Sequence, residues 1–374
     1  MNDTSEALDE GTQALLQRNC FDRETFEILR QRLRSGAASD EHNRIGGAVE
    51  PPQAGDIDEL RERGSPEHDR LTELGRGAIR DGKVGAVVLA GGMATRFGGL
   101  VKAAVPVVDD RSFLDVKLVD IQSAAQTAGG RVPIYLMTSF ATDDEISRLA
   151  AEATTEQAPV AAFRQFVSLR LTPEGELFRE DGGAPSPYAP GHGDLTFALR
   201  RSGVLSRFRE AGGEILFMSN VDNVVATLDP AIIGSHLAAG CAITVELAEK
   251  EPGDKGGAPA RVDGKLQIVE AFRFPEGFDQ DRIPVFNTNT LVLDARAIDR
   301  DFDLTWFAVH KKVDGRAAVQ FEHLVGQLTA FLPSHYLRVP RYGAESRFEP
   351  VKDPEELAKR RDSIRQALVA RGIL

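Results

Sequence analysis

The amino-acid sequence predicts an α/β fold built on a mainly parallel β-sheet. Apolar runs typical of buried strands occur at residues 84–89, 132–137 and 214–219. Segments with helical spacing lie between them, and this alternation of strand and helix is typical of parallel sheets. The chain has 374 residues, of which 42% are hydrophobic, so it can bury a sizeable core.

The N-terminal part differs in composition from the rest. Residues 7–33 carry apolar side chains at helical spacing, and a second short helix is expected at 71–79. Between them, residues 35–65 are rich in glycine, proline and acidic residues and are predicted to form a loop or linker. We expect three parts: an N-terminal helical segment with a flexible linker (1–80), the main α/β domain (81–340), and a C-terminal segment ending in a helix (341–374).

The middle of the chain follows the alternation of strand and helix. A short strand at 102–108 precedes a helix capped by Ser112, and strand 132–137 precedes a helix whose first turn is acidic. A long polar stretch at 173–190 is expected to pass over the ligand site. Further strands are predicted at 163–166, 214–219, 241–247, 265–270 and 286–293.

Charge and cysteine content exclude several classes of protein. The formal net charge of −12 argues against general binding of nucleic acid or of anionic membranes. The two cysteines, Cys20 and Cys241, are far apart in sequence, so no disulfide framework or cysteine metal site is expected and a reducing cytoplasm fits. The acidic N-terminus has no apolar signal region, and no apolar run approaches the length of a membrane span.

A glycine-rich turn follows the strand at 84–89 and is the clearest sign of a ligand site. It begins with Ala90, Gly91 and Gly92, and glycines let backbone N–H groups approach phosphate oxygens closely. Arg96 and Lys102 add positive charge beside those amides. The spacing matches neither a dinucleotide fingerprint nor a P-loop. On this turn alone, glycines that merely end a strand remain an alternative.

The glycine turn resembles the signature L-x-G-G-x-G-T-R-x-G…K of sugar-nucleotide pyrophosphorylases, with two departures. Ala94 replaces the middle glycine, and Val101 replaces the proline before the lysine. The run P-G-H-G-D at 190–194 is similar to that of UDP-glucose and UDP-sugar pyrophosphorylases. The glycines of that run would allow close approach to a ligand, and the imidazole of His192 could donate to a phosphate oxygen.

The resemblance implies a division of labour among the motif residues. Ala90, Gly91, Gly92, Gln165 and Gly191 would bind the nucleotide, with the Gln165 amide reading the uracil edge. Arg96, Lys102 and Lys352, the last in a run similar to S-R-F-L-P-V-K, would be the catalytic cations. The sugar phosphate would be bound by six residues: His192, Asn220, Lys255, Glu270, Asn287 and Asn289.

A metal ligand is implied by the run N-V-D-N at 220–223, which is similar to N-S-D-N in the family. Asp222 would hold Mg²⁺ together with phosphate oxygens, because one carboxylate plus phosphates is a common way of binding this ion. Val221 replaces the family's serine, and Asp254 replaces a valine beside Lys255. From the residues alone, Asp222 and Asn223 could also simply turn the chain.

The chain is therefore identified as a member of the UTP–glucose-1-phosphate uridylyltransferase family. This implies a three-layer α/β/α sandwich with a mixed, mainly parallel sheet, and the formation of UDP-glucose from UTP and glucose 1-phosphate. We expect the chain to lack the C-terminal β-helix domain of eukaryotic members. Three alternatives remain: a UDP-N-acetylglucosamine or broad-specificity UDP-sugar pyrophosphorylase, an inactive UDP-sugar-binding regulator, and a glycosyltransferase. The oligomeric state is not predicted.

Overall fold

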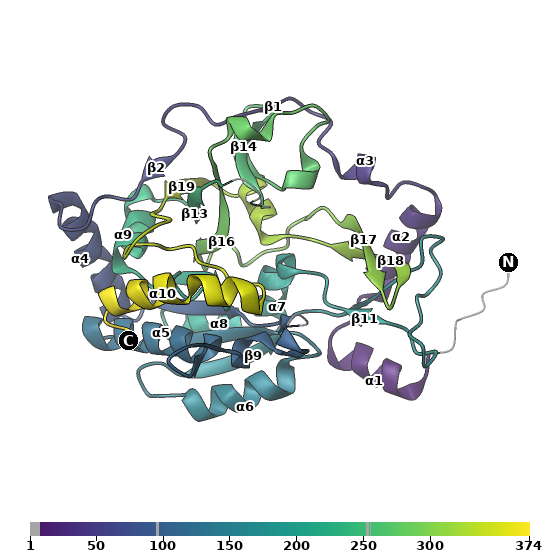
Figure 1. Cartoon of the computed structure of the whole chain (residues 1–374), viewed down its shortest axis with the longest axis horizontal. Helices are drawn as coiled ribbons and strands as arrows, with labels where there is room; N and C mark the ends of the chain where they lie inside the picture. The colour runs from purple at the N-terminus through teal and green to yellow at the C-terminus, as the bar shows by residue number, and fades with distance from the viewer. Residues whose placement is uncertain (1–7, 95–96, 252–253, 255) are drawn as a thin grey trace.

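An eight-stranded sheet forms the centre of the molecule (Figure 1). The computed structural model describes residues 8–94, 97–251, 254 and 256–374. β16 is antiparallel to both of its neighbours and every other neighbouring pair is parallel, which confirms the predicted mixed, mainly parallel sheet. In spatial order the strands are β2 (Asp58–Glu59), β19 (Ser334–Arg338), β13 (Ile243–Glu249), β16 (Val285–Asp294), β12 (Ile215–Asn220), β3 (Val84–Leu89), β8 (Ile134–Thr138) and β9 (Val160–Arg164).

Helices cover both faces of this sheet because its central strands are apolar on both sides. In β3, Val84, Ala86 and Val88 enter one core while Val87 enters the other. The first core is covered by α4 (Pro66–Arg80), α5 (Phe113–Ala128), α6 (Asp143–Ala153), α9 (Pro230–Ala239) and α10 (Pro354–Ala370). The second is covered by α7 (Leu195–Arg201), α8 (Val204–Glu210) and a small antiparallel sheet of β1 (Val49–Glu50), β14 (Ala258–Val262) and β15 (Lys265–Val269).

The N-terminal residues form two helices, α1 (Glu10–Arg18) and α2 (Arg23–Arg34), where the sequence pattern runs on without a break. The chain turns between them at Cys20, whose φ is +54°, and Asp22 caps α2 by accepting from the Thr25 N–H. Leu16, Phe26 and Leu29 pack into a third core. The short helix α3 (Asp40–Asn43) follows.

The polar stretch at 173–190 packs against these N-terminal helices, not over the ligand site as expected. It belongs to a hairpin closed by β10 (Ser168–Leu169) and β11 (Pro187–Tyr188), which lies beside β17 (Phe307–Val313) and β18 (Arg316–Glu322). Arg30 Nε donates to the carbonyl of Gly175 at 2.7 Å and so ties α2 to the tip of the hairpin. Figure 1 shows this subassembly at the right.

Segments on both sides of residues 81–340 extend the main sheet or pack against it. β2 and α4 precede residue 80, yet β2 extends the main sheet and α4 packs against α9 and α5. At the other end, Asp353 caps α10, whose Leu357, Ile364 and Leu368 are buried in the first core. In the described part of the chain, no helix is long and apolar enough to cross a membrane.

The glycine turn continues into two short hairpins before α5. These are β4 (Met93–Ala94) with β5 (Leu100–Val101), and β6 (Pro106–Val108) with β7 (Arg111–Ser112). A 3-10 helix at Lys102–Ala104 replaces the first half of the strand expected at 102–108. Ser112 caps α5 in a capping box with Asp115, as the sequence predicts.

Candidate active site

The site lies where β3 and β12 end, since Leu89 pairs with Asn220 at the carboxyl edge of the sheet. Open α/β sheets bind their ligands outside this edge. The turn at 90–92 and the polar run at 220–223 follow these two strands directly and are therefore neighbours. Gln165 follows β9 two strands away on the same edge.

Gly91 and Gln165, both predicted to bind the nucleotide, are in direct contact. A Cβ atom on Gly91 would lie 2.3 Å from Gln165 Nε2 and 3.3 Å from the main-chain nitrogen of Ser139. The side chain of Gln165 is 6% exposed and rests across the glycine. The lack of a side chain at Gly91 thus makes room for the buried amide. Ala90 beside it is fully buried, and its N–H donates to the carbonyl of Met137 at 2.8 Å.

Replacing Gly91 by alanine should raise the KM for UTP about tenfold with little loss of stability. The methyl group would push the flexible Gln165 side chain aside, and one lost hydrogen bond of about 1–1.5 kcal/mol corresponds to roughly a tenfold change. Steady-state kinetics against UTP would measure it. Gly77→Ala is the matched control, because a Cβ there meets only Arg80 at 3.6 Å. An unchanged KM in Gly91→Ala would remove Gln165 from nucleotide binding.

Lys102 and Asp222 form an ion pair between these turns, with side chains 15% and 19% exposed. The Lys102 N–H also donates to the carbonyl of Gly92 at 3.2 Å. Among the residues that the structure describes, no three histidine, cysteine or acidic side chains are grouped so that they could hold a metal ion by themselves. One carboxylate completed by phosphate oxygens suits Mg²⁺, so the donor set at Asp222 fits this ion when a nucleotide is bound with it.

The C-terminal segment is attached to the same turn. Asn223 Oδ1 accepts from the Glu349 N–H at 3.1 Å, and its Nδ2 donates to the carbonyl of Arg347 at 3.0 Å. The Val351 N–H donates to the carbonyl of Asp222 at 3.2 Å. Lys352 is the next residue and its side chain is exposed. Its role as a catalytic cation stays a prediction.

Asp254 lies in the loop that carries Lys255 and is paired with Arg341. Burial raises the pKa of Asp254, but hydrogen bonds from Arg341 and the nearby charges of Arg341 and Lys352 lower it below its usual value. Arg341 is itself buried and donates to Asp254 Oδ2 at 2.5 Å. Asp254, which stands where the family has valine, therefore holds Arg341 through hydrogen bonds. Lys255 and Arg96 lie outside the described residues.

Asparagines make the half of the site expected to bind the sugar. Asn289 Nδ2 donates to Asn220 Oδ1 at 2.9 Å, and the Asn289 N–H donates to Asn287 Oδ1 at 2.9 Å. Asn289 has φ +59°, and its Oδ1 is buried without a partner. Such a strained residue with an orphaned acceptor suits a ligand that donates a hydrogen bond, for example a hydroxyl group.

Glu270 lies beside these asparagines. A Cβ on Gly257 would come within 3.0 Å of its Oε1, and the carbonyl of Gly257 accepts from the Asn287 N–H at 2.7 Å. Burial raises the pKa of Glu270 to about 7, although Arg273 opposes this. The carboxyl group can therefore exchange hydrogen bonds with hydroxyl groups in either protonation state near neutral pH.

His192 is neutral and has a fixed tautomer. Its Nδ1 accepts from the Val325 N–H at 3.0 Å, so Nε2 carries the proton and can donate to an anion. Burial and the neighbouring His323 lower the pKa of His192 to about 4. The motif glycines make room for this arrangement: a Cβ on Gly191 would lie 2.8 Å from His323 O, and one on Gly193 would lie 2.5 Å from His323 C. The role of Gly191 in nucleotide binding stays a prediction.

The two valine departures fill the core beneath the site. Val221 is 3% exposed and Val101 is 6% exposed, and both belong to the first core. The Val221 N–H still donates to the carbonyl of Leu89 at 3.2 Å. Ala94 keeps its main-chain pairing with Leu100.

A buried ionic network under the site was missed by the sequence analysis. Lys117 Nζ donates to Ser219 Oγ at 3.0 Å and to the carbonyl of Ala226 at 2.7 Å, so it fixes both ends of the turn that carries Asp222. Arg347 donates twice to Glu246, at 2.7 and 2.6 Å. A usable signal existed for Lys117, because it interrupts the apolar face that runs from Phe113 to Ile121 on α5.

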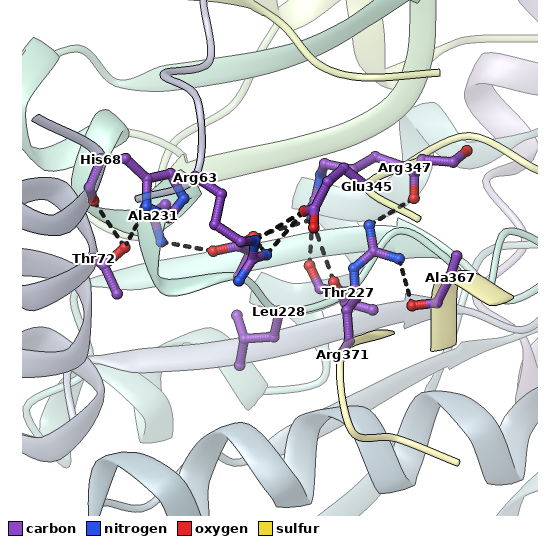
Figure 2. A network of polar contacts seen from close by, with 12 residues as sticks. Arg63, His68, Thr72, Thr227, Leu228, Ala231, Glu345, Arg347, Ala367 and Arg371 are labelled. Carbon is purple, nitrogen blue, oxygen red and sulfur yellow. Dashed lines mark hydrogen bonds and ion pairs between the residues drawn. The ribbon is translucent and has the colours of Figure 1, made fainter. Parts of the chain in front are cut away.

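Figure 2 shows the outer part of this network. Arg347 Nη2 donates to the carbonyl of Thr227 at 2.9 Å. Arg371 Nη2 donates to the carbonyl of Ser346, the residue before Arg347, at 2.7 Å. On the surface, Arg63 pairs with Glu345 at 3.0 Å. These contacts join the residues after the Asp222 turn to the C-terminal helix.

This arrangement of sheet, glycine turn and carboxylate is that of an α/β nucleotidyltransferase. A family model described as UTP–glucose-1-phosphate uridylyltransferase matches residues 30–364, and the chain belongs to this family. It is 28% identical over 326 residues to UTP–glucose-1-phosphate uridylyltransferase 2 of Dictyostelium discoideum, covering 83% of this chain and 63% of that protein. It is 30% identical over 291 residues to the Hordeum vulgare enzyme, covering 74% and 61%. The chain thus spans about three fifths of these curated relatives.

Solved structures share the fold. A UDP-glucose phosphorylase of Trypanosoma brucei superposes with a TM-score of 0.75 at 21% identity, covering 92% of this chain and 77% of that one. The uridine diphosphate N-acetylglucosamine pyrophosphorylase of the same organism superposes with a TM-score of 0.76 at 19% identity, covering 94% and 79%. At these identities the likeness establishes the architecture alone.

Proposed function

We propose that the protein is a uridylyltransferase that makes UDP-glucose and pyrophosphate from UTP and glucose 1-phosphate. One observation carries this: Gly91 and Gln165, the Lys102–Asp222 pair and the Asn220–Asn289 pair all lie at one edge of the sheet. This edge would supply a group that reads the base, a phosphate and metal centre, and hydrogen-bond partners for hydroxyl groups. Membership of the family supports the same reaction.

The proposed reaction is an in-line displacement at phosphorus. A phosphate oxygen of the sugar phosphate attacks the α-phosphorus of UTP, a new P–O bond forms, and the bond to the β-phosphate breaks to release pyrophosphate. The nucleophile is already an anion, so no general base is required. The difficulty is bringing two polyanions together, and catalysis rests on positioning and charge neutralisation.

The residues of the chain divide this work. Lys102, Arg96 and the amides of the glycine turn hold the phosphates that leave, and Lys352 and His192 hold the attacking phosphate. The asparagines and Glu270 orient the sugar. Asp222 would hold Mg²⁺, which when bound supplies positive charge to the α-phosphate. Since His192 is neutral, it contributes a hydrogen bond and not a charge.

Pyrophosphate release from UTP and Mg²⁺ should be fastest with glucose 1-phosphate in a panel of sugar 1-phosphates. Glucose, galactose and N-acetylglucosamine 1-phosphates test the sugar, and omission of the sugar is the blank. Preference for the N-acetylglucosamine compound would keep the reaction and replace the substrate. Binding of UDP-glucose without turnover of any sugar would instead favour a regulator. The cytoplasmic location expected from Cys20 and Cys241 stays a prediction.

A further inference from the structure

We propose that His323 is a positioning residue that, through Asp194, holds the nucleotide-binding and phosphate-binding segments in register. His323 directly follows β18 and belongs to none of the sequence motifs that predict a ligand site. The inference rests on the proposed function, because it concerns the same two substrates.

Asp194 is the centre of the connection. Its side chain is fully buried, Oδ1 lies 2.5 Å from His323 Nε2, and Oδ2 accepts from the Phe166 N–H at 3.0 Å. Phe166 directly follows Gln165. One buried carboxylate therefore joins the residue beside the base reader to His323, and a buried carboxylate is stable only when it is partnered in this way.

The main chain of His323 is hydrogen-bonded to the loop at residues 190–194, which is expected to bind phosphate. Its N–H donates to the carbonyl of Pro190 and its carbonyl accepts from the Gly193 N–H, both at 3.0 Å. Two residues further on, the Val325 N–H donates to His192 Nδ1 and fixes the histidine tautomer. The loop is held at 190, 192, 193 and 194 by residues 323–325, which explains why glycines are needed at 191 and 193.

The ring of His323 is held by stacking as well. It lies parallel to Trp306 with centroids 4.1 Å apart and to Phe197 at 6.0 Å, and only 3% of the residue is exposed. A cavity of about 210 Å³ adjoins these rings and is also lined by Phe166 and Pro190. Cavity, rings and both binding segments therefore meet at His323, and no substrate atom needs to touch it.

A positioning role and a merely structural role make different predictions. Loss of a structural residue lowers stability and the fraction of active enzyme, which reduces kcat for all substrates without changing KM. Loss of the link between His323 and Asp194 frees the segment after Gln165 and the loop that carries His192. The KM values for UTP and for glucose 1-phosphate should then rise together.

His323→Leu should raise both KM values about tenfold while kcat changes less than threefold, and His323→Gln should recover most of the loss because its amide can still donate to Asp194. Asp194→Asn combined with His323→Leu should cost no more than His323→Leu alone. His335→Gln is the matched control: His335 also pairs with an aspartate, Asp58 at 2.9 Å, near the amino end of β19 and away from the site. Unchanged KM values in a folded His323→Leu variant would overturn the proposal.

Binding measurements keep the proposal separate from the proposed reaction. If the wild-type protein turns over no sugar phosphate, calorimetric titration with UTP and with UDP-glucose replaces kinetics, and weaker binding in His323→Leu would still support the positioning role. If His323→Leu does not fold, Asp194→Asn, which can accept only one of the two hydrogen bonds that Asp194 accepts from His323 and Phe166, is compared with wild type by the fluorescence of Trp306, the single tryptophan of the chain. UTP should change that emission in the wild type and less so in the variant. Equal changes would count against the link.

Discussion

Replacing Asp222 by asparagine should lower the kcat for UDP-glucose formation by about 10²–10³-fold. The variant keeps the shape of the side chain but removes the charge that pairs with Lys102 and that would hold Mg²⁺. Its main-chain bond from the Val351 N–H does not depend on the side chain, so the C-terminal segment stays in place. Initial rates of pyrophosphate release at saturating UTP and Mg²⁺ measure the effect.

Asp299→Asn is the control for this experiment. Asp299 is also partly exposed and paired with arginines, Arg200 and Arg209, but it lies outside the site. Its replacement should leave kcat within a factor of two of wild type. An Asp222→Asn enzyme with nearly full activity would remove Asp222 from the mechanism, and an effect confined to the KM for Mg²⁺ would limit its role to metal affinity.

Replacing Arg347 by methionine should destabilise the protein by about 3–5 kcal/mol. Glu246 is fully buried and accepts two hydrogen bonds from Arg347, so the variant leaves an unpaired charge inside the protein. A loss of this size should lower the melting temperature by about 4–6 °C in a chain of this length. Thermal and urea unfolding monitored by circular dichroism measure both quantities.

The double variant Arg347→Met with Glu246→Leu tests the cause. Removing both charges should recover most of the lost stability, because the penalty comes from the uncompensated carboxylate. Lys359→Met, which breaks the exposed pair with Glu355, should change stability by less than about 0.5 kcal/mol. If the double variant is as unstable as the single one, packing of the arginine stem matters more than its charge.

The central strands of the sheet could be predicted because each is a short apolar run in the sequence. Residues 84–89 and 214–219 are apolar on both faces, and both are central strands. The helix break at Cys20 was not predictable from spacing, because Leu16 and Phe26 fit one helical pattern although they belong to two helices that pack on a common core. The position of the hairpin at 173–190 was predicted wrongly for a similar reason. It packs beside β18, which is more than a hundred residues away in the sequence.

The candidate site shows the same division. Motif residues such as Gly91, Gln165 and Asp222 could be named from the sequence, because each type suits a ligand group. The residues that hold these motifs in place could not be predicted, because they act through hydrogen bonds between residues far apart in the sequence. Examples are Lys117 with Ser219, and Asn223 with Arg347. The need for glycine at 191 was foreseen but its reason was not, because the neighbouring group is the main chain of His323.

The contacts of Asn223 also bear on how the protein folds. Its side chain bonds to Arg347, which is 124 positions away in the chain, and this closure completes the turn that carries Asp222. Contacts of such long range slow folding, because a large loop must be ordered before they form. During synthesis the glycine turn and Asp222 emerge well before Lys352. Helices depend on local contacts and can form earlier, so recovery of activity on refolding should lag behind recovery of helical structure.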